Sequence, residues 1–284
     1  MKSLDTQSPQ TWLGRTQRDV DDITAAPLQG LWATLDREGR QVLLGQDAPP
    51  LSHWLFFTPK APQASIGVDG HPTRGGFLPP VSLPRRMWAG GTLQFHHPLR
   101  VGDEVQRESR VMDVSEKDGR SGRLAFVTIR HELTNANGLA IMENQDIVYR
   151  EAALVGSPQP AGKAAPKDET FKRRVTPDPV QLFRFSALTF NAHRIHYDRE
   201  YATQVEGYPG LVVHGPFIAT LLLDLLNRQE PGATIRRFTF KAVGPLFDTH
   251  PFELCGRPYG ARKFALWARN LEGALAMEAS AEID

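Results

Sequence analysis

Apolar and polar residues alternate along two stretches in each half of the chain. The stretches are residues 92–117 and 124–150 in the first half, and residues 235–260 and 263–283 in the second. A period of two residues is typical of antiparallel strands that have one buried face. Turn-forming residues divide the stretches, most clearly Asn135-Ala136-Asn137-Gly138. The pattern therefore predicts two antiparallel sheets built in the same order.

A strongly apolar segment precedes the strands of the second half. Gly215 is the expected N-cap of a helix there, Pro216 is its first residue, where the missing N–H costs nothing, and Pro231-Gly232 ends it. Leucine and other apolar residues cover most of the circumference of this helix. We therefore expect other elements to enclose the helix, because a surface helix is apolar on one face only.

The order of a strand, a buried helix and a curled antiparallel sheet predicts a hot-dog unit. Residues 18–39 are the corresponding helix-like region of the first half, and they contain no histidine. Residues 151–170 are rich in Pro, Ala, Gly and Lys, which is typical of a linker. We expect an α+β, tandem hot-dog fold, with each half a sheet wrapped round a central helix. The domains would be residues 1–150 and 171–284, with a histidine-bearing site in the second only.

Composition narrows the class of protein. The 284 residues carry a formal net charge of +1 and are 40% hydrophobic, which argues against disorder and against a nucleic-acid binder. The single cysteine, Cys255, excludes an internal disulfide framework and a cysteine-rich metal site. Residues 1–14 lack the apolar core of a signal peptide, and residues 211–226 are too few to span a membrane. The sequence thus predicts a cytoplasmic protein without a membrane partner.

Polar groups with acid–base chemistry gather just before the apolar helix. His193 and His196 are three residues apart and project to the same side of a helical turn, whereas Asn191 and His193 share a face if the chain is extended. The amides at Gly215 open a helix, so they lack intrahelical acceptors and lie at the positive end of the helix dipole. An imidazole, an amide side chain and an oxyanion-binding helix start suit a reaction that forms an enolate from a carbonyl compound.

Residues 186–215, SALTFNAHRIHYDREYATQVEGYPGLVVHG, resemble the signature of the MaoC-like, (R)-specific enoyl-thioester hydratases. That signature runs Asp-x-Asn-Pro-Ile/Leu-His-x-Asp and continues to a His-Gly at the central helix. Residues 73–91 and 99–105 are similar to the first domain of a two-domain branch, which includes mitochondrial 3-hydroxyacyl-thioester dehydratase type 2 and bacterial mesaconyl-C4-CoA and itaconyl-CoA hydratases. The resemblance implies a hydro-lyase without a cofactor that reversibly hydrates a short enoyl-CoA, with a branched dicarboxylic thioester favoured.

The same resemblance assigns roles to individual residues. The catalytic histidine of the family falls on His196, and its oxyanion-hole glycine falls on Gly215. The catalytic aspartate falls on Asn191 and the family's asparagine on His193, which is a departure from the pattern. Because an asparagine cannot accept a proton, the base would be His196 or His193, with Asp198 as a partner for an imidazole. His196 paired with Asn191 is the favoured arrangement, with His193 as the close alternative.

Several nearby residues are candidates for substrate binding. Arg85, Arg86 and Arg194 could hold the phosphates of CoA or a free carboxylate, since a guanidinium suits both. Asp198 could contact the substrate or cap the next short helix. His214 could contact the substrate or stack beneath the start of the apolar helix.

Four other functions compete with this interpretation. A fatty 3-hydroxyacyl-thioester dehydratase would use the same chemistry on a longer chain. A hot-dog acyl-CoA thioesterase would direct the activated water to the carbonyl carbon. A zinc enzyme would use His193, His196 and His214 as ligands, although no strong zinc spacing is present and no metal is expected. A non-catalytic binder of acyl-CoA would have no turnover, and a homodimer is compatible with all of these.

Overall fold

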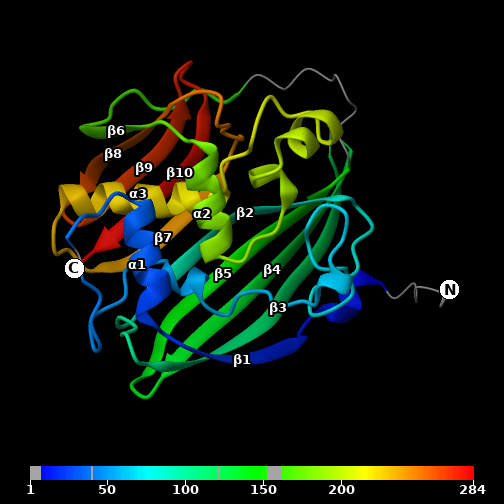
Figure 1. Ribbon diagram of the computed structural model, residues 1–284, viewed down its shortest axis with the longest axis horizontal. Coiled ribbons are helices and arrows are strands. Elements are labelled where there is room, and N and C mark those ends of the chain that lie inside the picture. The colour runs from blue at the N-terminus through cyan, green and yellow to red at the C-terminus, as the bar shows by residue number, and fades with distance from the viewer. Residues whose placement is uncertain (1–7, 40, 120–121, 152–161) are drawn as a thin grey trace.

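The computed structural model describes residues 8–39, 41–119, 122–151 and 162–284. In this part of the chain ten strands form one antiparallel sheet, in the order β1-β3-β4-β5-β2-β7-β10-β9-β8-β6 (Figure 1). The strands are β1 Thr16–Asp22, β2 Arg85–Phe95, β3 Glu104–Gly119, β4 Gly122–Asn135, β5 Gly138–Arg150, β6 Phe171–Val175, β7 Ile235–Ala242, β8 Phe252–Gly260, β9 Lys263–Asn270 and β10 Leu275–Ile283. Strands β1–β5 make one half of the sheet and β6–β10 the other. The predicted α+β, antiparallel architecture is confirmed, but the two halves form one continuous sheet instead of two, because β2 pairs with β7.

The helices are few and mostly short. They are α1 Ala25–Thr34, α2 Pro179–Leu188, α3 Gly215–Gln229, the 3₁₀ turns η1 Pro9–Trp12, η2 Ser52–Leu55, η3 Gln63–Ser65 and η4 Arg194–His196, and the π-helical turn η5 Tyr201–Val205. No helix within these ranges is long and apolar enough to cross a membrane. Of the expected linker, residues 152–161 lie outside the described part of the chain, so the division into two domains stays a prediction.

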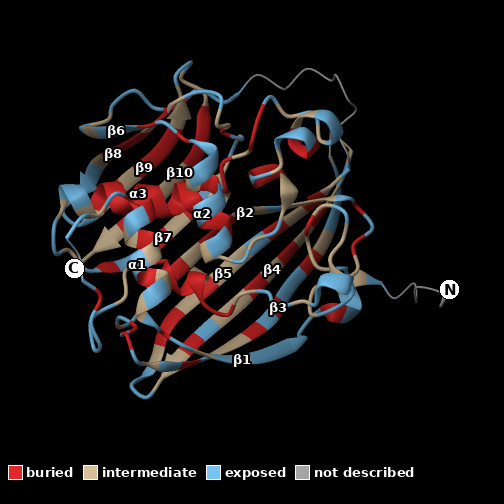
Figure 2. Ribbon diagram, in the orientation of Figure 1, coloured by how far each residue is buried: buried red, intermediate tan, exposed pale blue. Residues whose placement is uncertain are grey.

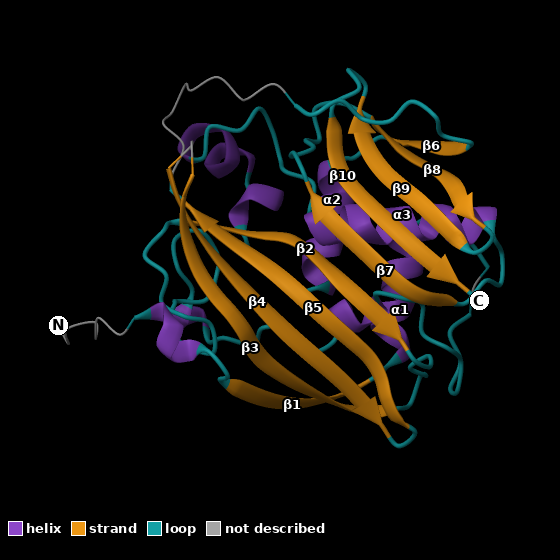
Figure 3. Cartoon of the chain, turned by 180° about the vertical axis from the view of Figure 1, so that it is seen from behind, coloured by secondary structure: helices purple, strands orange, loops and turns teal. Residues whose placement is uncertain are grey.

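Helix α3 is enclosed, as its all-round apolar pattern predicts. Every residue from Phe217 to Leu226 is buried, and the helix packs against β8, β9 and β10 (Figures 2 and 3). His214 is the N-cap and Gly215 the first helical residue, so the predicted N-cap is wrong by one position. The helix ends at Gln229, just before the Pro231-Gly232 stop. The apolar residues of α1 join the same hydrophobic core, which therefore spans both halves.

The two halves of the sheet meet where β2 pairs with β7, and two glycines allow this approach. A Cβ atom on Gly90 would lie 2.5 Å from the carbonyl oxygen of Phe240, and one on Gly91 would lie 2.7 Å from that of Asn144. Contacts this short do not occur for real Cβ atoms. Glycine at both positions therefore lets β2 fit between β5 and β7.

A buried carboxylate on α3 ties the helix to both halves. Asp224, whose side chain is 3% exposed, pairs with Arg37, Arg173 and Arg228 at 2.7–2.8 Å. Arg37 follows α1 and Arg173 lies in β6, whereas Arg228 lies one turn further along α3. The three guanidinium groups compensate the desolvation of the carboxylate, so its removal would leave several cations without their partner.

We expect Asp224→Ala to lower the free energy of unfolding by about 3–5 kcal/mol, because it breaks a buried charge cluster. Urea denaturation followed by circular dichroism measures the change. Asp47→Ala is the control, since its pairing with Arg100 is exposed and such pairs contribute about 0–1 kcal/mol. Equal losses for the two variants would contradict a structural role for the buried cluster.

Candidate active site

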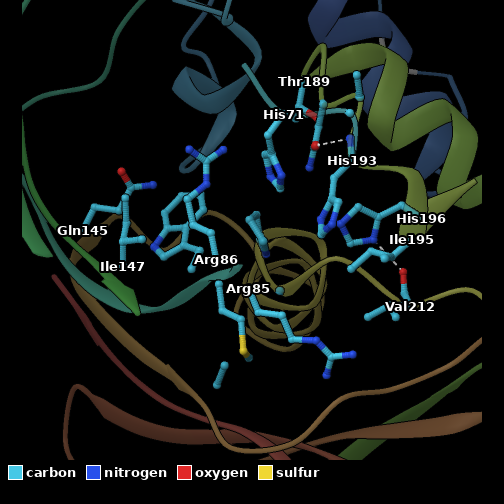
Figure 4. Close-up of a pocket in the computed structure, with 18 of the residues that line it drawn as sticks. His71, Arg85, Arg86, Gln145, Ile147, Thr189, His193, Ile195, His196 and Val212 are labelled. Carbon is cyan, nitrogen blue, oxygen red and sulfur yellow. Dashed lines mark hydrogen bonds between the residues drawn. The ribbon is translucent and has the colours of Figure 1, made fainter. Parts of the chain in front are cut away.

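A cavity of about 2380 Å³ lies where the first half of the sheet and its loops meet the loops of the second half and the start of α3. His196 and Gly215 both line this cavity, so the imidazole and the helix start face a common space. The wall also includes Arg86, Asn191 and His193, and Figure 4 shows the histidines and arginines around it. The volume exceeds that of a pocket for one small metabolite, about 300–1,000 Å³, and can receive a long, partly polar ligand.

The tautomer of His196 is fixed by a backbone carbonyl. Its Nδ1 lies 2.7 Å from the carbonyl oxygen of Val212, and because that oxygen can only accept, Nδ1 carries the hydrogen (Figure 4). Nε2 therefore has a free lone pair. Burial lowers the pKa of His196 to about 4, so the ring is neutral at neutral pH and can accept a hydrogen bond or a proton.

His214 supports His196 from behind. The two rings stack with centroids 3.7 Å apart and planes within 17° of parallel, and Nε2 of His214 is 2.8 Å from Oγ of Ser186. His214 is fully buried and does not appear among the described residues that line the cavity. Burial holds its pKa well below the usual range. This placement favours the stacking alternative over contact with substrate.

Asn191 and His193 shape the loop beside His196. Oδ1 of Asn191 accepts a hydrogen bond of 3.0 Å from the backbone N–H of His193, so this oxygen holds the loop. The ring of His193 makes an edge contact with His196, with centroids 5.4 Å apart. Burial lowers the pKa of His193 to about 2, which makes its lone pair a weaker proton acceptor than that of His196. Of the two candidate bases, His196 is the better suited.

The first half of the chain also brings a histidine to this cavity. His71, from a loop of the first half, lines the cavity and packs against His193 with ring centroids 4.2 Å apart. Nδ1 of His71 lies 3.0 Å from Oδ2 of Asp69. The sequence offered one local signal, the Asp-x-His spacing just before residues 73–91, but nothing in it showed which part of the chain this loop would meet.

Two of the three candidate arginines have carboxylate partners within the protein. Arg85 pairs with Glu206 at 2.8 Å. Arg194 binds Oδ2 of Asp198 through Nε and Nη2, at 3.0 and 2.7 Å, and stacks over the ring of Tyr201. These pairings leave both guanidinium groups less available to a ligand.

Asp198 is also engaged away from the imidazoles. While Oδ2 binds Arg194, Oδ1 accepts a hydrogen bond of 3.0 Å from the backbone N–H of Tyr201. The side chain of Asp198 thus holds Tyr201, the first residue of η5, which agrees with the capping role that the sequence left open. Its carboxylate pairs with no histidine in the part of the chain that the structure describes.

Arg86 is the third of these arginines and differs from the other two. It lines the cavity from the first residues of β2, near Gln145 and facing the histidines (Figure 4). No carboxylate of residues 8–39, 41–119, 122–151 or 162–284 lies within 4.0 Å of its guanidinium. Its side chain hydrogen-bonds to the hydroxyl of Tyr149, whose pKa is raised by burial. Arg86 is therefore a cation that faces the cavity without an internal counterion.

One group of side chains has donor atoms close enough to share a cation. Among the described residues, ligand atoms of Asp69, His71 and His193 lie within 4.8 Å of one another, whereas His193, His196 and His214 form no such group. Both oxygens of Asp69 already accept hydrogen bonds from His71. These contacts make the group a hydrogen-bonded carboxylate–imidazole pair beside a third ring, rather than an open set of metal ligands.

Known proteins resemble this chain over most of its length. A family profile for hydroxyacyl-thioester dehydratase type 2 matches residues 51–248. A mesaconyl-C(4)-CoA hydratase from Chloroflexus aurantiacus is 49% identical over 273 residues, which are 96% of each chain. The mitochondrial hydroxyacyl-thioester dehydratase type 2 of Schizosaccharomyces pombe is 30% identical and covers 83% of this chain and 88% of its own.

Solved structures agree on the fold. A MaoC-like dehydratase from Phytophthora capsici superposes with a TM-score of 0.69 at 16% identity, covering 95% of this chain and 96% of its own. A Mycobacterium tuberculosis protein described as a double hot-dog fold gives a TM-score of 0.57 at 13% identity, covering 96% of both chains. The predicted tandem hot-dog fold is confirmed.

We expect the imidazole of His196 to titrate with a midpoint near pH 4 in NMR spectra. Because burial lowers its pKa, the ring should stay neutral as the pH falls from 8 to 5 and take up a proton only below that range. His196→Gln assigns the signal, because it removes this imidazole from the spectrum. A midpoint near 6.5 would show that water reaches the ring freely.

Proposed function

The chain belongs to the hydroxyacyl-thioester dehydratase type 2 family of hydro-lyases, and on this premise we propose that it reversibly hydrates a short, branched dicarboxylic enoyl-CoA such as mesaconyl-C4-CoA. The observation that carries the proposal is the meeting of three groups at one cavity. They are the free lone pair of His196, the start of α3 at Gly215 and the unpaired cation of Arg86. The expected cytoplasmic location and the domains 1–150 and 171–284 are retained as parts of this proposal.

The start of α3 would bind the thioester oxygen. First-turn amides have no intrahelical acceptors, and the helix dipole adds positive potential at this end. Gly215 leaves room for the ligand, since the nearest atom to a Cβ built there would be the carbonyl oxygen of Trp88 at 3.8 Å. Negative charge that develops on the thioester oxygen as water attacks would thus be stabilised where the amides point.

His196 would hold the attacking water through Nε2. As the water oxygen bonds to the β carbon, its O–H bond breaks, the proton passes to an imidazole, and the π electrons move toward the thioester oxygen. The enolate then takes a proton at the α carbon, which restores the thioester carbonyl. Dehydration is the reverse of these steps, and a positioned proton transfer of this kind contributes about 10²–10⁴-fold to the rate.

Arg86 would bind the free carboxylate at the other end of the acyl group. A guanidinium matches a carboxylate with two parallel hydrogen bonds, and Arg86 is available for them because no carboxylate of the described residues pairs with it. Arg85 and Arg194 are paired with Glu206 and Asp198. Arg86 is therefore the residue that we propose to select dicarboxylic over plain acyl chains.

A fatty hydroxyacyl-thioester dehydratase is the second candidate function. The 30% identity to the mitochondrial fission-yeast dehydratase and the size of the cavity favour it. The chemistry at His196 and Gly215 would be the same in both cases, and the two functions differ only in what lies at the far end of the acyl group.

A panel of enoyl-CoA esters separates the two functions. We expect mesaconyl-C4-CoA to gain the mass of one water and crotonyl-CoA to react far more slowly, as followed by mass spectrometry of the intact thioesters. His196→Gln should lower kcat by about 10²–10⁴-fold. Turnover of straight-chain esters alone would contradict the dicarboxylic assignment, and release of free thiol would indicate a thioesterase.

Arg86→Gln tests the carboxylate contact directly. We expect KM for mesaconyl-C4-CoA to rise about 10- to 100-fold, since hydrogen bonds to a charged group are worth about 1.5–3 kcal/mol. The rate with crotonyl-CoA should change little, because that substrate has no second carboxylate. Arg174→Gln, at an exposed position outside the cavity, is the control. An equal rise in KM for mesaconyl-C4-CoA and crotonyl-CoA would mean that Arg86 binds the CoA part of the substrate instead.

A further inference from the structure

A loop of the first half docks directly on the histidine loop of the second half. The backbone N–H of Arg194 donates to the carbonyl oxygen of Asp69 at 2.9 Å, and Nη1 of Arg194 donates to that of Val68 at 3.1 Å. Gly70, at φ +91°, lies so close that a Cβ there would be 1.7 Å from the carbonyl oxygen of Ala192. Only glycine permits this approach, so the fit of the two loops is specific.

The docked loop holds His71 in one orientation. Its backbone closes through a hydrogen bond of 2.7 Å from the N–H of Gly67 to the carbonyl oxygen of His71. Asp69 accepts at Oδ1 from the backbone N–H of His71 and at Oδ2 from the ring Nδ1, both at 3.0 Å. A carboxylate can only accept here, because the pKa of Asp69 is held far below its usual range by its bonds to His71, against the effect of burial. Nε2 of His71 is therefore left with the lone pair.

His71 and His196 have different partners behind them. His196 donates to a neutral carbonyl, whereas His71 donates to a carboxylate that is ionised at neutral pH. When an imidazole takes a proton, a carboxylate behind it compensates the new positive charge and a carbonyl does so far less. Both rings line the cavity and flank His193 (Figure 4).

We infer that His71, positioned by Asp69, is a second catalytic residue of the hydration and the one that takes the proton of the attacking water. His196 then orients the same water through a hydrogen bond to its Nε2. The water O–H bond breaks as the O–Cβ bond forms, and the proton becomes bound to Nε2 of His71. The imidazolium next to Asp69 returns this proton to the α carbon, where the enolate electrons form the C–H bond, and both rings end neutral. This inference rests on the proposed hydratase activity.

The test uses the full chain and the enoyl-CoA ester that the wild-type protein hydrates fastest. We expect His71→Ala to lower kcat by about 10²–10⁴-fold with little change in KM, because the lost group acts on the water and not on substrate binding. Added imidazole should restore part of the lost rate, since the cavity has room for it. A purely structural role would not give this rescue.

Asp69→Asn is the second variant, because its amide oxygen can still accept from the backbone N–H of His71, whereas its NH2 group removes the charged acceptor behind the imidazole ring. We expect it to lower kcat while KM and the thermal midpoint stay near the wild-type values. Asp47→Asn and His96→Gln are matched controls at exposed positions outside the cavity, and both should keep the wild-type rate. Activity should also survive treatment with EDTA, because the pair acts without a cation.

The possible results distinguish the catalytic role of His71 from the proposed hydratase function. A wild-type rate in folded His71→Ala would overturn the role of His71 and leave the hydratase function intact, with His196 as the base. A loss in His71→Ala that imidazole does not relieve, combined with a normal rate in Asp69→Asn, would also overturn it. Loss of activity in EDTA would overturn the proton transfer by His71, because it would show that the reaction requires a metal ion. A wild-type protein that hydrates no ester would refute the proposed function and this role together.

Discussion

The pairing of β2 with β7 is the contact on which the rest of the structure depends. It joins the two halves of the sheet, and it forms only because Gly90 and Gly91 have no side chains to meet the neighbouring carbonyl oxygens. The same junction brings the start of β2, with Arg86, and the loop of His71 to the side of α3 where the second-half histidines lie. A site assembled from both halves is thus a consequence of a close backbone contact.

Burial determines what the histidines at this site can do. Four imidazole rings form a row in which each contacts the next: His71, His193, His196 and His214. Desolvation lowers the pKa of each ring. Adjacent imidazolium cations would repel one another in such a place, so the neutral forms are favoured. Their tautomers then depend on what each Nδ1 or Nε2 contacts. Three of these neutral rings, those of His71, His193 and His196, therefore line the cavity.

Ion pairs within the protein distinguish the three candidate arginines from one another. Residue type alone makes Arg85, Arg86 and Arg194 equal candidates for an anionic ligand. In the folded chain Arg85 and Arg194 pair with Glu206 and Asp198, and Arg194 also fixes the docked loop through Val68. Arg86 lines the cavity, and none of the carboxylates that the structure describes forms an ion pair with it.

The sequence by itself determined the strands, the enclosed helix and the choice of His196 and Gly215 as candidate site residues, because each follows from residues near one another in the chain. Period-two alternation, the apolar run after Pro216 and the spacing of residues 186–215 are local signals. Only the tertiary structure decided that His71 faces His193, that His214 stacks behind His196, and that Arg86, of the three candidate arginines, has no carboxylate partner among the described residues. These facts depend on contacts between residues far apart in the sequence, and a side chain's partners set its charge, tautomer and availability.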